Sequence, residues 1–150
     1  MTNRRILIAE DFAPFREFVV STLKQRAEFQ VVGQCSDGWE AVERAEQLQP
    51  DLILLDIGLP TLNGFEVAHR TRKLCPNSRI LFLTQESSPD VVEDALNLGA
   101  LGYVVKAHAG NELLEAVEAV VQGKQFVSRC LRPYLPSNEP PRQPEPTLSR

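Results

Sequence analysis

The stretch Leu52-Ile53-Leu54-Leu55-Asp56 decides the fold, because four apolar residues in a row end at a single carboxylate. Three other apolar runs also end at a polar or charged residue, namely Ile6–Ala9, Ile80–Leu83 and Tyr103–Val105. Unbroken runs of this length that are rich in Ile, Leu and Val are typical of parallel strands with both faces buried. The four runs therefore predict four buried strands of a parallel sheet.

Helical signals lie between these strands and set the fold class. One more strand is predicted at Phe29–Cys35. Apolar residues recur at helical spacing near residues 15–23, 41–48, 65–74, 91–96 and 111–122. The last of these helices is expected to turn Glu112, Glu115 and Glu118 outward. Strand and helix thus alternate five times, which indicates an α/β protein with a parallel sheet and helices on both faces.

The residues that follow the apolar runs are all polar or charged. Glu10 and Asp11 follow the first run, Asp56 the second, Thr84 the third and Lys106 the fourth. Because the carboxyl ends of parallel strands share one edge of an open sheet, where ligand sites gather, these side chains are expected to meet in one cleft. Crowded carboxylates repel one another unless a cation balances them, and Mg²⁺ prefers oxygen ligands. The pattern therefore predicts a site for a divalent cation and a phosphoryl group.

Each of these residues also has an ordinary structural explanation. Glu10 and Asp11 could cap a helix, and Asp56 could be a turn residue. Thr84 could be a helix cap, and Lys106 a solvated surface charge. Their joint placement at strand ends favours a functional interpretation. A carboxylate at the tip of the central strand can attack phosphorus to form an aspartyl phosphate, which needs positioning and charge neutralisation more than acid–base chemistry.

The composition is that of a soluble single-domain protein. The chain has 150 residues, is 43% hydrophobic, and its formal net charge of −4 gives no sign of a basic nucleic-acid surface. No stretch approaches the ~18 apolar residues of a membrane span, and no signal-peptide segment precedes the first strand. Cys35, Cys75 and Cys130 lack a CxxC pattern and are expected to be reduced thiols, so the cytoplasm is the expected location.

The composition changes at about Arg129. Six of the eleven prolines lie between there and Arg150, and no apolar period accompanies them. We therefore expect a domain over residues 1–128 and a proline-rich, disordered tail or linker over residues 129–150.

Four stretches resemble the receiver domains of bacterial two-component response regulators. They are ILIAED at 6–11, DLILLDIGLPTLNG at 51–64, ILFLT at 80–84 and GALGYVVK at 99–106. The stretch LLEAVEAVVQGKQFVS at 113–128 is most similar to the NarL/LuxR-type subfamily. The resemblance covers about residues 4–128. It implies a flavodoxin-like (βα)5 fold, a doubly wound parallel sheet with the strand order 2-1-3-4-5.

The resemblance also implies a role for each site residue in two-component signal transduction. Asp56 would accept a phosphoryl group from the phosphohistidine of a sensor histidine kinase, and Lys106 would pair with that group. Mg²⁺ would be held by Glu10, Asp11, Asp56 and the backbone carbonyl of Gly58. Thr84 and Tyr103 would form the switch pair, with Thr84 moving towards a phosphoryl oxygen and the ring of Tyr103 turning inward.

The implied output of such a phosphoprotein is a surface change and not an enzymatic turnover. Phosphorylation would alter the face formed by the helix near residues 91–96, the strand at Tyr103–Val105 and the helix near residues 111–122. That face would then bind a downstream protein or a second copy of the chain. New hydrogen bonds to a phosphoryl group, at about 1.5–3 kcal/mol each, could supply the ~5.5 kcal/mol that a complete two-state switch requires.

Two departures from the family pattern are visible. Gln85 stands after the switch threonine, where the family usually has a small residue, so it could crowd the phosphoryl site. The NarL/LuxR-type subfamily normally continues into a helix-turn-helix domain, but no recognition helix is evident after Ser128. Nucleic-acid binding is therefore not carried over, and the alternative is the receiver part of a truncated DNA-binding transcriptional regulator.

Two other classes of protein are less compatible with the sequence. A Mg²⁺-dependent phosphohydrolase of the haloacid-dehalogenase type needs a second aspartate two residues after the nucleophile, where this chain has Gly58. A flavodoxin-like FMN protein needs a loop rich in hydroxyl groups and glycine after the first strand. This chain has the acidic stretch Glu10–Pro14 there, which would repel a phosphate without a metal.

Overall fold

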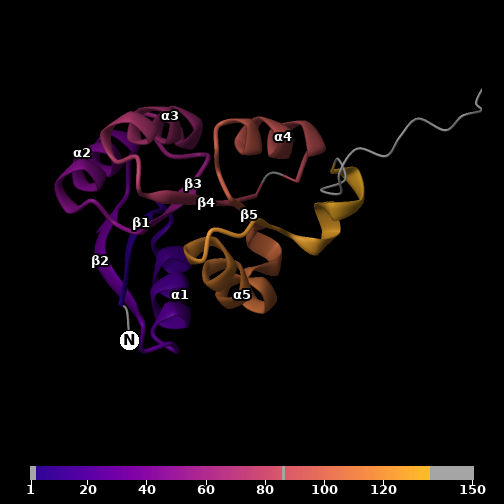
Figure 1. Ribbon diagram of the computed structural model, residues 1–150, viewed down its shortest axis with the longest axis horizontal. Coiled ribbons are helices and arrows are strands. Elements are labelled where there is room, and N and C mark those ends of the chain that lie inside the picture. The colour runs from indigo at the N-terminus through magenta and orange to yellow at the C-terminus, as the bar shows by residue number, and fades with distance from the viewer. Residues whose placement is uncertain (1–2, 86, 136–150) are drawn as a thin grey trace, which may run out of the picture.

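The computed structural model describes residues 3–85 and 87–135, which form three layers with a parallel sheet in the middle (Figure 1). The strands are β1 (Arg4–Ala9), β2 (Phe29–Cys35), β3 (Leu52–Asp56), β4 (Arg79–Thr84), β5 (Gly102–Val105) and β6 (Phe126–Val127). The helices are α1 (Ala13–Leu23), α2 (Gly38–Leu48), α3 (Gly64–Leu74), α4 (Pro89–Asn97) and α5 (Ala109–Val121). Two 3-10 helices follow strands, η1 (Lys106–His108) and η2 (Arg129–Tyr134).

The predicted strand order is confirmed with one addition. The described residues form a sheet in the order β2-β1-β3-β4-β5-β6, and each neighbouring pair is parallel. The extra strand β6 pairs with β5 in the register Gly102↔Phe126 and Tyr103↔Val127. A run of two apolar residues is too short for periodicity to identify, so the sequence pattern does not predict β6.

The central strand β3 shows how the sheet is covered on both faces. Leu52 to Leu55 are fully buried, and their side chains alternate between the two faces. Ile53 and Leu55 pack with α2, α3 and α4, whereas Leu52 and Leu54 pack with α1 and α5. Figure 1 shows the same division of the helices about the sheet. Full burial of each Leu or Ile stabilises the fold by about 1.5–3 kcal/mol, which is why this stretch decides it.

Side-chain caps fix the starts of α2 and α3 at the C-terminal edge of the sheet. Asp37 caps α2 by accepting a hydrogen bond from the Glu40 N–H at 2.9 Å. Asn63 caps α3 in the same way, accepting from the Glu66 N–H at 3.0 Å. Each such cap satisfies a backbone donor that the helix leaves without a partner. The two helix starts are therefore held firmly beside the end of β3.

The chain after β6 packs on the domain over the described residues. Arg129–Tyr134 forms η2, and Leu131 is only 3% exposed. Leu131 lies in the same buried cluster as Val92 of α4 and Tyr103 of β5. The segment expected as a tail from residue 129 therefore begins with packed residues, and the part from residue 136 lies outside the described residues.

The expectation that Glu112 faces solvent is wrong. Glu112 is 4% exposed and accepts a hydrogen bond from the Ser128 hydroxyl at 2.6 Å. Glu115 is exposed as expected, and Glu118 is partly exposed and pairs with Arg26, in the turn after α1, at 3.1 Å. The spacing along α5 puts all three on one side of the helix, but the segment after β6 covers the first of them.

The expectations about membrane spans and about the three cysteines can be compared with the structure. Over the described residues, no helix has the length and apolar character needed to span a membrane. Cys35 and Cys75 are buried free thiols, and Cys130 is an exposed one. Burial raises the pKa of the Cys35 thiol to about 12, so this residue acts as inert packing.

Candidate functional site

An open cleft of about 800 Å³ lies where β1, β3, β4 and β5 end. It is lined by all but one of the predicted site residues, namely Glu10, Asp11, Asp56, Gly58, Thr84 and Lys106. The exception, Tyr103, lies inside the core. The structure thus brings together the side chains that the strand ends predicted, while their individual roles stay predictions.

Three carboxylates form an acidic cluster in this cleft. One oxygen from each of Glu10, Asp11 and Asp56 lies within 4.8 Å of the other two. Asp11 is exposed, whereas Glu10 and Asp56 are only 1% and 7% exposed. The cluster is therefore buried at Glu10 and Asp56 and open to solvent at Asp11. Oxygen donors of this kind fit Mg²⁺, which binds through a few carboxylates and keeps several of its waters.

Lys106 supplies the positive charge among the residues that line the cleft in the described part of the chain. Its Nζ lies 2.6 Å from Glu10 Oε1 and 3.3 Å from Asp56 Oδ2. The same ammonium group lies 4.9 Å from the centre of the Phe15 ring, a cation–π contact. When all are ionised, three carboxylates and one ammonium leave an excess of two negative charges. A divalent cation matches this surplus.

Burial and the neighbouring charges shift the pKa of Glu10. Burial is the largest influence and raises its pKa above the ordinary value of 4.5. Hydrogen bonds from Lys106 and from the Phe12 N–H lower the pKa of Glu10, and the nearby charge of Asp56 raises it again. The Phe12 N–H donates to Glu10 Oε2 at 3.0 Å. Ionised Glu10 is therefore only partly compensated, and a further cation would stabilise it.

The backbone after β3 holds Asp56 in place. The Gly58 N–H donates to Asp56 Oδ1 at 3.1 Å. Gly64 begins α3, and a Cβ atom there would lie 2.4 Å from the backbone oxygen of Asp56. Its N–H donates to the Ile57 carbonyl at 2.8 Å. Only glycine lets α3 approach the end of β3 this closely.

The loop between Asp56 and α3 is clamped against the start of α2. Thr61 has a φ of 66°, which is uncommon for a β-branched residue, and its hydroxyl donates to Asp37 Oδ1 at 3.3 Å. The Gly38 N–H donates to the Pro60 carbonyl at 3.0 Å. Backbone strain of this kind is often found at functional sites. Sequence reasoning did not reveal this clamp, because it joins segments that are far apart in the chain.

The predicted switch residues occupy different environments. Thr84 ends β4, is 2% exposed and lines the cleft. Tyr103 lies within β5 and is fully buried, with its ring centre 6.5 Å from that of Phe82. The ring of Tyr103 is therefore turned inward in this structure.

Phe15 is a cleft residue that sequence reasoning missed. It shares a helical stripe with Val19 and Thr22, which suggested ordinary core packing. In the structure Phe15 is half-buried, and its ring contacts the ammonium group of Lys106. The available signal was its place in the first turn after Asp11, which puts it at the edge of the cleft. Gln85, which departs from the family pattern, also lines the cleft.

Comparison with known proteins identifies the family to which the chain belongs. Residues 6–118 match the response regulator receiver domain, so the chain belongs to that family. It is 37% identical over 123 residues to the transcriptional regulatory protein DegU of Brevibacillus brevis, covering 82% of this chain and 52% of DegU. It is 34% identical over 130 residues to the nitrate/nitrite response regulator protein NarL of Escherichia coli strain K12, covering 87% of this chain and 60% of NarL.

The solved structures agree with this assignment. The crystal structure of a two-component response regulator of the LuxR family from Aurantimonas sp. SI85-9A1 superposes with a TM-score of 0.84 at 28% identity, covering 89% of this chain and 95% of that one. The predicted resemblance to receiver domains of two-component systems, and among them to NarL/LuxR-type regulators, is thereby confirmed. The chain spans little more than half the length of DegU and NarL.

Proposed function

We propose that this receiver domain takes a phosphoryl group from the phosphohistidine of a sensor histidine kinase onto Asp56. One observation carries the proposal: Asp56 lies in the acidic cluster at the tip of β3, and Lys106 Nζ is 3.3 Å from its Oδ2. A carboxylate placed in this way has a cationic partner for the incoming group and can be approached through the open cleft.

In the transfer, a carboxylate oxygen of Asp56 attacks phosphorus in line with the P–N bond of the phosphohistidine. The new P–O bond forms as the P–N bond breaks, and the electron pair of that bond stays on the imidazole. Lys106 turns from Glu10 to donate hydrogen bonds to a phosphoryl oxygen. Mg²⁺, when bound, supplies positive charge against the phosphoryl oxygens, and its ligands would be Glu10, Asp11, Asp56 and the backbone carbonyl of Gly58.

The response to phosphorylation passes from the cleft to a binding surface. The Thr84 hydroxyl moves to a phosphoryl oxygen, and the Tyr103 ring is held in the space behind it. This rearranges the face formed by α4, β5 and α5, to which a downstream protein or a second copy of the chain binds. A phosphoryl group can bias such a two-state element through charge-assisted hydrogen bonds.

The proposed location is the cytoplasm. Cys35, Cys75 and Cys130 are all free thiols, as expected in a reducing compartment. Immunodetection of the protein in separated cell fractions would test the location.

The test of the proposed function is phosphorylation of the full chain with a small phosphodonor or a phosphorylated kinase in the presence of Mg²⁺. We expect the intact mass to increase by one phosphoryl group that is labile in base. Asp56→Asn should abolish the increase, because the amide is a poor nucleophile. Asp90→Asn, at an exposed position on α4, makes the same chemical change away from the cleft and should leave it intact. Unchanged labelling of Asp56→Asn would refute the assignment.

A second candidate function is that of the receiver part of a DNA-binding transcriptional regulator. The observation in its favour is that the chain covers only 52% of DegU, whose name is that of a transcriptional regulatory protein. The genomic reading frame after the codon for Arg150 decides between the two. A helix-turn-helix region in frame would support the regulator, and a stop codon would leave a receiver that acts through protein contacts.

A further inference from the structure

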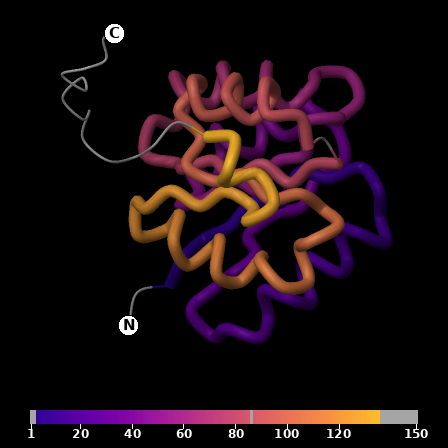
Figure 2. Tube along the Cα trace, turned by 90° about the vertical axis from the view of Figure 1, so that its right-hand side faces the viewer, coloured from indigo at the N-terminus to yellow at the C-terminus, as the bar shows by residue number. Residues whose placement is uncertain are grey.

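Residues 126–135, here called the C-terminal arm, lie along the edge of the domain between α4 and α5. Figure 2 shows the yellow end of the described chain passing between these two helices. Its strand β6 extends the sheet beside β5, and Leu131 is buried with Tyr103 of β5 and Val92 of α4. The arm therefore covers part of the face through which the proposed output occurs.

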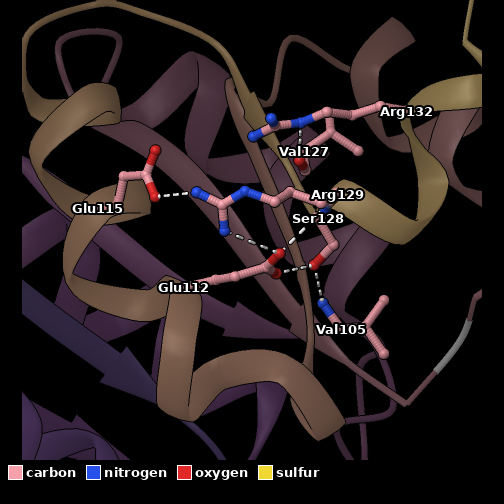
Figure 3. A network of polar contacts seen from close by, with 7 residues as sticks. All are labelled: Val105, Glu112, Glu115, Val127, Ser128, Arg129 and Arg132. Atoms are coloured by element: carbon pink, nitrogen blue, oxygen red, sulfur yellow. Dashed lines mark hydrogen bonds and ion pairs between the residues drawn. The ribbon is translucent and has the colours of Figure 1, made fainter.

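Ser128 and Glu112 attach the arm to the domain (Figure 3). The Ser128 hydroxyl donates to Glu112 Oε1 at 2.6 Å and accepts from the Val105 N–H at 2.9 Å. The other oxygen of Glu112 accepts from the Arg129 N–H at 3.0 Å. Ser128 is fully buried and Glu112 is 4% exposed. Because each side-chain oxygen has a partner away from water, this is a specific connection and not a solvated contact.

The network reaches Val105, which directly precedes Lys106 of the proposed phosphorylation site. The pairing of β6 with β5 stops at Tyr103↔Val127, and the Ser128 N–H donates to the Tyr103 carbonyl at 2.9 Å. The next N–H of β5 on that side belongs to Val105, and it finds the Ser128 hydroxyl in place of a backbone carbonyl. Lys106 follows directly, with its ammonium group between Glu10 and Asp56. Ser128 thus fixes the backbone from which Lys106 reaches into the cleft.

We propose that Ser128 and Glu112 are positioning residues for Lys106, and that attachment of the C-terminal arm and phosphoryl binding at Asp56 strengthen each other. This inference rests on the proposed function, because it deepens the role of the same site. Coupling between two sites is reciprocal. If the attached arm favours the placement of Lys106 that a phosphoryl group needs, a bound phosphoryl group must favour the attached arm by the same factor.

The sign of the coupling follows from the hydrogen bonds. Without the Ser128 hydroxyl, the Val105 N–H and one oxygen of the buried Glu112 lose their partner. Unpaired buried groups are unfavourable, so the end of β5 relaxes until they meet water. Lys106 then starts from a wider range of positions and must be ordered when the phosphoryl group binds, which weakens binding.

The test uses the full chain and beryllofluoride, a phosphoryl mimic, titrated at saturating Mg²⁺ and followed by fluorine NMR. Ser128→Ala removes the hydroxyl, and Glu112→Gln leaves one acceptor oxygen where Ser128 and Arg129 need two. Glu115→Gln is the matched control, since it makes the same charge change on α5. The Glu115 carboxylate lies 2.5 Å from the exposed guanidinium group of Arg129 and does not contact Ser128 or Val105 in the described residues. Val42→Ala, on the buried face of α2, controls for a general loss of stability.

We expect Ser128→Ala and Glu112→Gln each to weaken beryllofluoride binding about fivefold or more, and both controls to stay within about twofold of the wild type. Hydrogen exchange at residues 126–129 should slow when beryllofluoride binds the wild type, and this protection should shrink in Ser128→Ala. Equal affinity in all variants, or equal weakening by Val42→Ala, overturns the inference and leaves the proposed function intact. A wild type that does not bind beryllofluoride overturns the proposed function, and the inference with it.

Discussion

Glu10 and Glu112 are almost equally buried, at 1% and 4% exposure, but their surroundings differ in charge. Around Glu10, three carboxylates face the single ammonium group of Lys106. Around Glu112, the carboxylates of Glu112 and Glu115 face the guanidinium group of Arg129. The buried Glu112 also accepts hydrogen bonds from the Ser128 hydroxyl and the Arg129 N–H. Surplus negative charge in an open cleft, rather than burial alone, therefore separates a binding site from a structural network.

The two clusters also differ in how they meet solvent. Asp11 keeps the acidic cluster open at its rim, so an ion can enter with part of its water shell. Ser128, a fully buried residue of the C-terminal arm, keeps water from the Glu112 end of the other network, and only the pair of Arg129 with Glu115 is exposed. Substitutions in the first cluster should therefore change ligand binding more than stability, and those in the second should do the reverse. Three predictions test this contrast.

The largest effect is expected for Mg²⁺ binding by Asp11→Asn. Asp11 is the exposed carboxylate of the cluster, whereas both oxygens of Glu10 already have partners in Lys106 and the Phe12 N–H. We expect Asp11→Asn to lower Mg²⁺ affinity by at least about tenfold, since even outer partners of metal ligands typically cost that much. Glu10→Gln should lower it less. Calorimetric titration of both variants measures the difference.

Glu112→Gln is the control for this prediction, because, like Glu10→Gln, it replaces a buried glutamate by its amide. Its Mg²⁺ affinity in the absence of a phosphoryl mimic should match that of the wild type. If Asp11→Asn and Glu112→Gln bind Mg²⁺ equally well, the acidic cluster is not the metal site, and the contrast between the two regions fails.

A smaller effect is expected for stability when Glu112 is changed. The amide of Glu112→Gln leaves one buried donor of the network without an acceptor, so we expect the free energy of unfolding to fall by about 1–3 kcal/mol. Glu115→Gln removes only an exposed pair with Arg129 and should change it by less than about 0.5 kcal/mol. Urea unfolding of the two variants provides the comparison. Equal values would mean that the Glu112 network adds nothing beyond a surface ion pair.

The sheet and the cleft could be predicted from the sequence, because the information for them is local. Leu52–Leu55 is a continuous apolar run that only a doubly covered strand can bury, and Asp56 follows it directly. The alternation of such runs with helical patterns then fixes which strand ends share an edge. Resemblance to a family added the roles of individual residues, which no local pattern contains.

The C-terminal arm could not be predicted in this way, because its contacts join distant segments. Phe126-Val127 is too short a run to identify a strand, and Leu131 is an isolated apolar residue beside Arg132 and Pro133. Glu112 has the spacing of an exposed helix face, and its burial depends on Ser128, sixteen residues further along the chain. The pairing of Lys106 with Glu10 was likewise invisible, since the sequence showed the shared edge but not the distances.

The smallest effect is expected for the stability of Glu10→Gln, and its sign is the sharpest test of the contrast. Burial raises the pKa of Glu10 above 4.5, so the folded state disfavours ionisation of this group relative to the unfolded chain. The contribution of Glu10 to stability is therefore fully present below pH 4.5 and is lost as the pH rises through the folded-state pKa. At neutral pH the ionised side chain lowers the free energy of unfolding.

We therefore expect Glu10→Gln to melt slightly above the wild type at neutral pH in EDTA, with a flatter dependence of melting temperature on pH. Saturating Mg²⁺ should reverse the order, because an ion that binds only the folded state stabilises the wild type more than a variant lacking one of its ligands. Glu112→Gln should melt below the wild type in both conditions, since both oxygens of the buried Glu112 already accept hydrogen bonds and no open cleft of the described residues admits an ion beside them. If Glu10→Gln also melts below the wild type in EDTA at neutral pH, the Lys106 ion pair compensates Glu10 fully. The difference between the two buried glutamates would then lie in solvent access and not in charge.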